Sequence, residues 1–137
     1  MSLRAFNESL YREHFDELAA MSELRSAWLA DGECSPDEVA GLEERMEAHL
    51  DALVLGGRVA LDLAETIARP EEPWSFYAWV AVACRSDDLE LLRGVLVALQ
   101  GACDAAGEGI EPVVLRRAMA EALVHHVPNA WRGPLVE

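Results

Sequence analysis

The chain has 137 residues and a mass of 15.0 kDa, about the size of one average domain, and its 52% hydrophobic content excludes a disordered tail. Its 11 basic residues, all arginine, stand against 25 acidic residues and leave a net charge of −14. This charge opposes binding to nucleic acid and to anionic membranes, and it favours a basic partner.

The N-terminal residues and the cysteines indicate a cytoplasmic protein. The first ten residues lack the apolar core of a signal peptide, and the longest uncharged run, residues 73–84, is too short to cross a bilayer. Cys34, Cys84 and Cys103 form no Cys-x-x-Cys pair and no even set. A chain of this size needs no disulfide or metal framework, and we expect none.

Apolar residues recur at spacings of three and four along most of the chain, and this periodicity predicts an all-α fold. The first helix is expected over residues 7–30. The second begins at Pro36, directly after a serine cap, and extends to about Arg69. Because a short turn joins them, the two helices should form a long antiparallel hairpin over residues 1–70.

Gly56 and Gly57 interrupt the second helix of this hairpin. Without a bend, the helix would be roughly 50 Å long at about 1.5 Å of rise per residue. Each glycine costs about 1 kcal/mol of helix propensity relative to alanine, so a packing or bending reason should offset the cost. Close approach of another helix is our preferred explanation.

Three shorter helices are expected in residues 71–137. They cover residues 74–84, residues 87–103 and residues 112–126. The first of them is apolar all round, which places it at the centre of the fold or in an interface.

A faint internal repeat relates these shorter helices. Glu72-Pro73 and Glu111-Pro112 lie 39 residues apart, a spacing that suits a HEAT-like helical hairpin. The chain would then hold one complete repeat and an unfinished second one followed by a further segment. Trp131 and its neighbours would cap the unfinished repeat or hold a partner there.

His14 and His49 are the first candidates for chemistry, because they lie on facing stripes of the predicted hairpin. Counting outward from its turn places the two rings within one helical turn of each other. A metal site is disfavoured, because neither histidine has the Glu-x-x-His spacing of di-iron bundles, and the adjacent His125 and His126 should point to different sides of their helix. We expect buried neutral imidazoles, hydrogen-bonded to the neighbouring helix, through Asp51 or a hydroxyl group.

Two arginines, Arg25 and Arg45, are expected beside these histidines in a structural polar core. Arg25 falls on the inward stripe of the first helix. A semi-buried arginine needs a carboxylate partner, which Glu38 or Glu44 could supply.

Glu43, Glu47 and Asp51 recur every fourth residue on the second helix, with Glu44 beside them. Like charges at this spacing repel by a few tenths of a kcal/mol per pair, so folding does not favour them. Solvation explains such a stripe in most proteins. The alternative is a docking face for a partner rich in lysine and arginine. Acid/base catalysis is disfavoured, because these carboxylates should lie on a convex, wetted helix.

Catalytic signatures are missing from the sequence. It contains no Gly-x-Gly-x-x-Gly, no Walker lysine and no Gly-x-Ser-x-Gly. We therefore expect no catalytic residues, no metal, no cofactor and no enzymatic activity.

Part of the chain resembles the N-terminal region of an uncharacterised proteobacterial family. The resemblance covers roughly residues 10–100 and is most specific at Arg45, Ala48-His49-Leu50-Asp51 and Gly56-Gly57. Longer members of that family look like HEAT-type helical repeat proteins and are often encoded near type VI secretion components. The resemblance implies an interaction module, either an immunity protein or an adaptor for a secreted effector.

The sequence therefore predicts a non-enzymatic module that binds a basic protein, and the resemblance implies that this partner is a type VI secretion effector toxin. The residues expected to bind the partner are Glu43, Glu44, Glu47, Asp51 and Trp131. One alternative is a metal- or ligand-binding helical bundle that uses His14 and His49. Another is a homo-oligomeric structural subunit whose seam is the apolar helix at residues 74–84.

Overall fold

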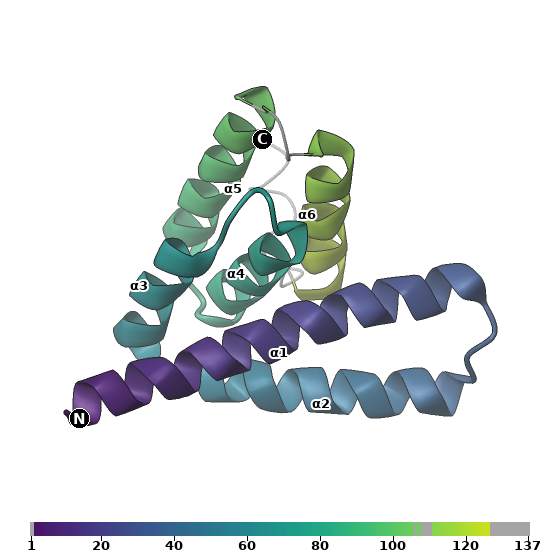
Figure 1. The fold of residues 1–137 in the computed structure, drawn as a ribbon, viewed down its shortest axis with the longest axis horizontal. Coiled ribbons are helices and arrows are strands. Elements are labelled where there is room, and N and C mark those ends of the chain that lie inside the picture. Colours follow the sequence, from purple (N-terminus) through teal and green to yellow (C-terminus); the bar gives the residue numbers. More distant parts are fainter. Residues whose placement is uncertain (1, 106, 108–110, 127–137) are drawn as a thin grey trace.

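The computed structural model describes residues 2–105, 107 and 111–126, and this part of the chain is all α with no extended strand. The prediction of an all-α fold is confirmed. Figure 1 shows a long helical hairpin with the remaining helices gathered along one side of it. The six helices are α1 Leu3–Asp31, α2 Pro36–Leu55, α3 Gly57–Ile67, α4 Pro73–Arg85, α5 Leu89–Asp104 and α6 Pro112–His126.

The α1–α2 hairpin forms because both helices begin at serine caps and carry a continuous apolar stripe. The Ser2 hydroxyl accepts a hydrogen bond from the backbone N–H of Ala5, and the Ser35 hydroxyl accepts one from that of Glu38. The two stripes meet in the hairpin interior. Their buried residues are Phe15, Leu18 and Met21 from α1 and Leu42, Met46, Leu50 and Leu53 from α2.

The expectation of one helix from Pro36 to about Arg69 is wrong, because the chain breaks into α2 and α3 at Gly56 and Gly57. Gly57 has a φ of 56°, a left-handed conformation that glycine adopts without steric cost. A Cβ on Gly56 would lie 2.8 Å from Cζ of Tyr11 on α1. Close approach of another helix therefore does explain Gly56, as predicted, and Figure 1 shows α3 turning away from the line of α2.

Helix α4 lies at the centre of the fold. Its residues from Phe76 to Cys84 are all buried, and it packs against each of the other five helices in the described part of the chain. This explains why its sequence is apolar all round. Residues 76–84 are covered by the chain's own helices, so this helix is not an exposed seam for a second copy.

Helices α5 and α6 complete the core from the far side of α4. The Asp88 carboxylate caps α5 by accepting a hydrogen bond from the backbone N–H of Leu91. Leu92, Val95 and Leu99 of α5 and Leu115 of α6 are buried. Among the described residues, no helix has both the length and the apolar character needed to cross a membrane.

Candidate functional site

His14 and His49 lie together between α1 and α2, as the sequence predicted. Their Nδ1 atoms are 2.9 Å apart and their ring centroids 5.2 Å apart. One ring therefore donates its Nδ1–H and the other accepts, so each histidine is the partner of the other in place of Asp51 or a hydroxyl group. Both side chains are half-buried rather than buried. Burial, followed by the neighbouring His14, lowers the pKa of His49.

The described residues contain no group of three or more histidine, cysteine, aspartate or glutamate side chains arranged to hold a metal ion. Two nitrogens that already share a hydrogen bond would be an incomplete ligand set. The paired histidines form a polar contact between α1 and α2.

Arg25 pairs with a different carboxylate from the two that the sequence suggested. Its Nε donates to Oε1 of Glu43 at 2.8 Å, so neither Glu38 nor Glu44 is the partner. The Arg25 side chain is mostly buried, with 17% of its surface exposed. Arg45, in contrast, is exposed on α2, and its assignment to the polar core is wrong.

The acidic stripe of α2 is half neutralised within the chain. Glu43 bonds to Arg25, and both carboxylate oxygens of Glu47 bond to Arg85 of α4. Such a bidentate ion pair is the geometry that arginine and carboxylates favour. Glu44 and Asp51 are exposed. Two carboxylates of the stripe therefore hold α2 against α1 and α4, and the other two face solvent. Because half of the charges are paired, like charges at this spacing are tolerated.

A polar cluster that the sequence did not predict surrounds the hydroxyl group of Tyr77. This hydroxyl lies 2.8 Å from Nδ1 of His125 and 3.0 Å from Nε2 of His126. The expectation that the adjacent histidines point to different sides is wrong, because their ring centroids are only 4.4 Å apart. The available signal was Tyr77 itself, since a tyrosine on a wholly apolar helix needs a partner for its hydroxyl group.

Burial sets the protonation states in this cluster. It lowers the pKa of His126 to about 3 and also lowers that of His125. Burial likewise raises the pKa of Tyr77. At neutral pH the cluster is therefore uncharged, and its hydrogen bonds join α4 to the last turn of α6.

A second polar contact joins α1 to α6. The hydroxyl group of Ser26, a buried residue, donates to Oε1 of Glu121 at 2.8 Å, and Arg117 reaches the same oxygen at 3.3 Å. A shallow groove of about 440 Å³ lies beside this contact, with Leu29 and Val124 among its lining residues. The groove is mainly apolar, and Arg25 in its described lining is already paired with Glu43.

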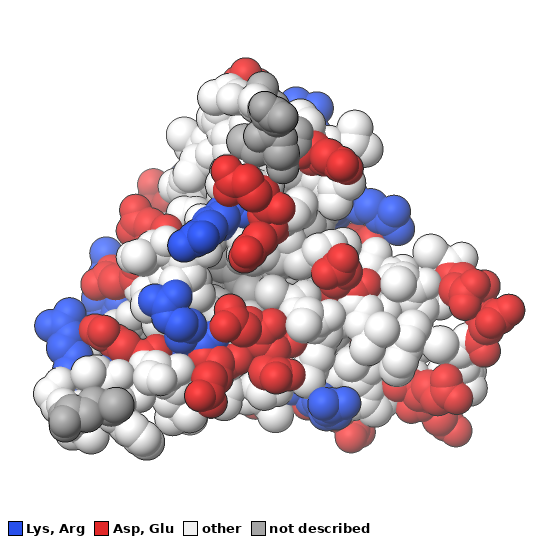
Figure 2. Space-filling view, viewed as in Figure 1, with Lys and Arg blue, Asp and Glu red and all other residues white. Residues whose placement is uncertain are grey.

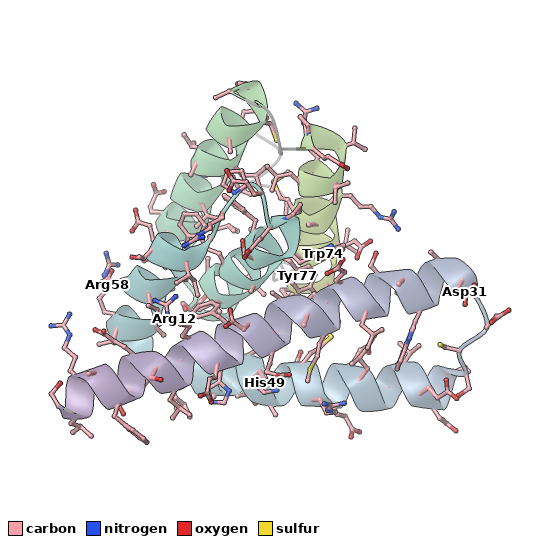
Figure 3. All side chains as sticks on the ribbon, viewed as in Figure 1. Arg12, Asp31, His49, Arg58, Trp74 and Tyr77 are labelled. Atoms are coloured by element: carbon pink, nitrogen blue, oxygen red, sulfur yellow. The ribbon has the colours of Figure 1, made fainter. Side chains whose placement is uncertain are left out.

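A different kind of cleft lies between α1 and the start of α4, and we call it the acidic cleft. It has a volume of about 400 Å³. One wall is the face of α1 that carries Asp16, Ala19, Ala20 and Glu23, and the other carries Glu71, Glu72 and Trp74. In Figure 2 acidic side chains lie on both sides of a hollow near the middle of this face. Figure 3 shows Trp74 next to Tyr77, above the middle of α1.

The loop wall of the acidic cleft is held in place by a tight turn. The backbone N–H of Glu72 donates to the carbonyl of Arg69 at 3.0 Å. The Ser75 hydroxyl group accepts from the N–H of Arg69 at 2.9 Å and donates to the carbonyl of Glu72 at 2.6 Å. These bonds fix the loop before any ligand arrives. Glu71 and Glu72 are therefore presented at the cleft by a rigid turn.

The carboxylates of the acidic cleft lack partners in the described part of the chain. Asp16, Glu23, Glu71 and Glu72 are exposed, and no ion pair there includes them. Neither arginine nor histidine belongs to the lining formed by the described residues. The cleft thus combines an apolar floor with four carboxylates that form no ion pair with the described residues, and sequence periodicity could not place them together.

Trp131, which the sequence suggested as a partner-binding residue, lies outside the described residues. The thiols of Cys84 and Cys103 are buried in the core. Comparisons with protein-family models, with curated proteins and with solved structures find no match to this chain.

Proposed function

We propose that this chain is a non-enzymatic module that binds a basic protein partner, and that the acidic cleft is its main docking point. The observation that carries the proposal is the set of four carboxylates around a cleft with no basic residue in its described lining. Unpaired charge of one sign on both walls raises the local concentration of cations and speeds their association. The net charge of −14 acts in the same direction at longer range.

The acidic cleft is a better docking point than the acidic stripe of α2. Two of the stripe's four carboxylates, Glu43 and Glu47, are already neutralised by arginines of this chain. A partner would have to break those pairs before it could use them. Glu44 and Asp51, which are exposed on α2, would then serve as a secondary contact.

The kind of partner follows from the family resemblance, which stays a prediction. It favours a secreted effector associated with type VI secretion, which this chain would neutralise or escort. The same resemblance and the 39-residue offset favour a HEAT-like repeat, in which α4 and α5 form one complete helical hairpin and α6 begins a second. These helices do pack against one another, with α4 in contact with both others.

Binding of a labelled basic peptide would test the proposal. We would measure the fluorescence anisotropy of a fluorescein-labelled peptide of alternating lysine and arginine, titrated with the full chain at two salt concentrations. The cleft variant replaces the four carboxylates by amides: Asp16→Asn, Glu23→Gln, Glu71→Gln and Glu72→Gln. The affinity of this variant should fall by about tenfold or more, because the removal of four local carboxylate charges weakens a salt-dependent complex.

A matched control removes the same charge elsewhere. The end of the α1–α2 hairpin, which comprises the turn and the adjoining ends of the two helices, carries four exposed acidic residues, and Figure 2 shows a second group of acidic side chains there. The control variant is Asp31→Asn, Glu33→Gln, Asp37→Asn and Glu38→Gln. Both variants have the same net charge, so long-range attraction falls equally in both. Equal loss of affinity in the two variants would refute the cleft as docking point, and salt-independent binding would refute the basic partner.

A further inference from the structure

We propose that the acidic cleft accepts the side chain of a single arginine from the partner, with the guanidinium group stacked on Trp74 and bonded to carboxylates from both walls. This inference rests on the proposed function. It goes further, because a lysine of the partner would match the negative charge of the cleft as well as an arginine would. Three features of the cleft support the inference. Its apolar floor suits the stem of either basic side chain, and its two-sided carboxylates and its tryptophan favour arginine over lysine.

The floor of the cleft suits a long side chain with an apolar stem. Phe15 and Ala78, which are buried, and Ile67, which is half-buried, lie beneath the opening. Ala19 and Ala20 on the α1 wall are small and leave the space open. Arginine and lysine both bury their methylene stems on apolar surface while the charged head stays among polar groups. The cleft therefore offers the stem a place that a flat acidic surface would not.

The carboxylates surround the position that the charged head would take. Asp16 and Glu23 come from α1, two helical turns apart, and Glu71 and Glu72 come from the turn locked by Ser75. A guanidinium has five N–H donors in a planar fork and can bond to carboxylates on two sides at once. An ammonium group is a compact, strongly hydrated charge with three donors, and gains less from carboxylates that are spread around it.

Trp74 supplies the surface on which a planar cation stacks. Its side chain is half-buried and lines the cleft, and it packs against Tyr77, with ring centroids 6.0 Å apart and a tilt of 43°. A cation over an aromatic face is attracted by the ring, tryptophan is the strongest such ring, and arginine is found there more often than lysine.

Three peptides that differ in one residue would test the inference. Each is a Gly/Ser nonapeptide with blocked, uncharged termini and arginine, lysine or citrulline at its centre, so that this residue carries any charge that the peptide has. The full chain, labelled with ¹⁵N, is titrated with each peptide while the indole N–H resonance of Trp74 is followed by NMR. Substitution Trp74→Phe identifies that resonance by its disappearance. We expect the arginine peptide to bind about fivefold more tightly than the lysine peptide, and the citrulline peptide to cause no shift.

Two substitutions of Trp74 separate stacking from packing. In these variants the affinity is measured from the backbone amide shifts of the other cleft residues, because the indole resonance is absent. Trp74→Leu should bring the affinity for the arginine peptide down to that for the lysine peptide, whereas Trp74→Phe should keep part of the preference. Circular dichroism and the one-dimensional amide spectrum establish that both variants are folded. Retention of the full arginine preference in folded Trp74→Leu would overturn the stacking role.

The outcomes also separate this inference from the function on which it rests. Equal affinities for arginine and lysine peptides, both lost in the four-carboxylate cleft variant, would overturn the arginine site and leave the basic-partner function supported. Shifts confined to the α1–α2 turn, or equal shifts with citrulline, would overturn both. An arginine preference that disappears in the cleft variant and persists in the turn control supports both.

Discussion

Acidification should destabilise this protein through His126, although the protein as a whole carries excess negative charge. The His126 side chain is buried in the last turn of α6, and burial lowers its pKa to about 3. In the unfolded chain the same imidazole has its ordinary pKa of about 6.5. Between these two values the unfolded state binds a proton that the native state does not. Stability is therefore complete above pH 6.5 and falls as the pH decreases from 6.5 towards 3.

The size of the effect follows from the two pKa values. Linkage gives about 1.4 kcal/mol per pH unit inside that window, so His126 alone should lower the free energy of unfolding by ~2 kcal/mol between pH 7 and pH 5. Burial also lowers the pKa of His49 and His125, which adds to the loss. Protonation of surface carboxylates relieves self-repulsion and acts in the opposite direction. A variant without the buried imidazole is needed to separate the two effects.

Urea denaturation at pH 7 and pH 5, followed by circular dichroism at 222 nm, measures this difference. His126→Gln should reduce the pH-dependent loss by ~2 kcal/mol relative to the parent chain, because glutamine does not titrate. Tyr77→Phe is the matched control: it removes the hydroxyl group that bonds to His126 but keeps the imidazole buried, so the pH dependence should remain. Identical pH dependence in the parent chain and His126→Gln would refute the reasoning.

Three further predictions concern the contacts that hold the helices together. Gly56→Ala should lower the free energy of unfolding by about 1–3 kcal/mol, because its Cβ would meet the ring of Tyr11; an unchanged urea midpoint would contradict the close approach. Glu47→Gln should cost about 0.5 kcal/mol in low salt and nothing measurable in 1 M NaCl, since its pair with Arg85 is partly exposed. Ser26→Ala should cost about 1–2 kcal/mol in thermal or urea denaturation because it removes the buried donor to the α6 carboxylate, and a neutral effect would exclude that bond as a stabilising contact.

Local signals in the sequence were enough to locate most of the helices. Ser35 and Pro36 mark the start of α2, and the wholly apolar run after Pro73 identifies the central helix. The proximity of His14 and His49 also followed from sequence, because an antiparallel hairpin with a known turn fixes which positions face each other, but their hydrogen bond to one another did not.

Contacts between residues that are far apart in the chain could not be predicted from these local signals. Whether Gly56-Gly57 bends or breaks a helix depends on Tyr11, which is 45 residues away in the chain. Arg25 bonds to Glu43 and not to Glu44, the next residue along α2. Successive residues of a helix point about 100° apart, so a modest error in the expected rotation of α2 about its axis changes the partner. The cluster around Tyr77 requires that α6 pack against α4, and the acidic cleft requires that the turn after α3 return to α1. Neither arrangement is encoded in the periodicity of a single helix.

The central position of α4 ties the two ends of the polypeptide into one cooperative unit. A fragment that stops before Pro73 would leave the apolar stripes of α1 and α2 without the helix that covers them, and the complementary fragment would carry that helix uncovered. Each piece would expose a large hydrophobic area and aggregate in isolation, whereas the two produced together could reassemble around the shared helix. A cut or an inserted domain between the hairpin and the rest of the molecule would therefore disrupt the fold.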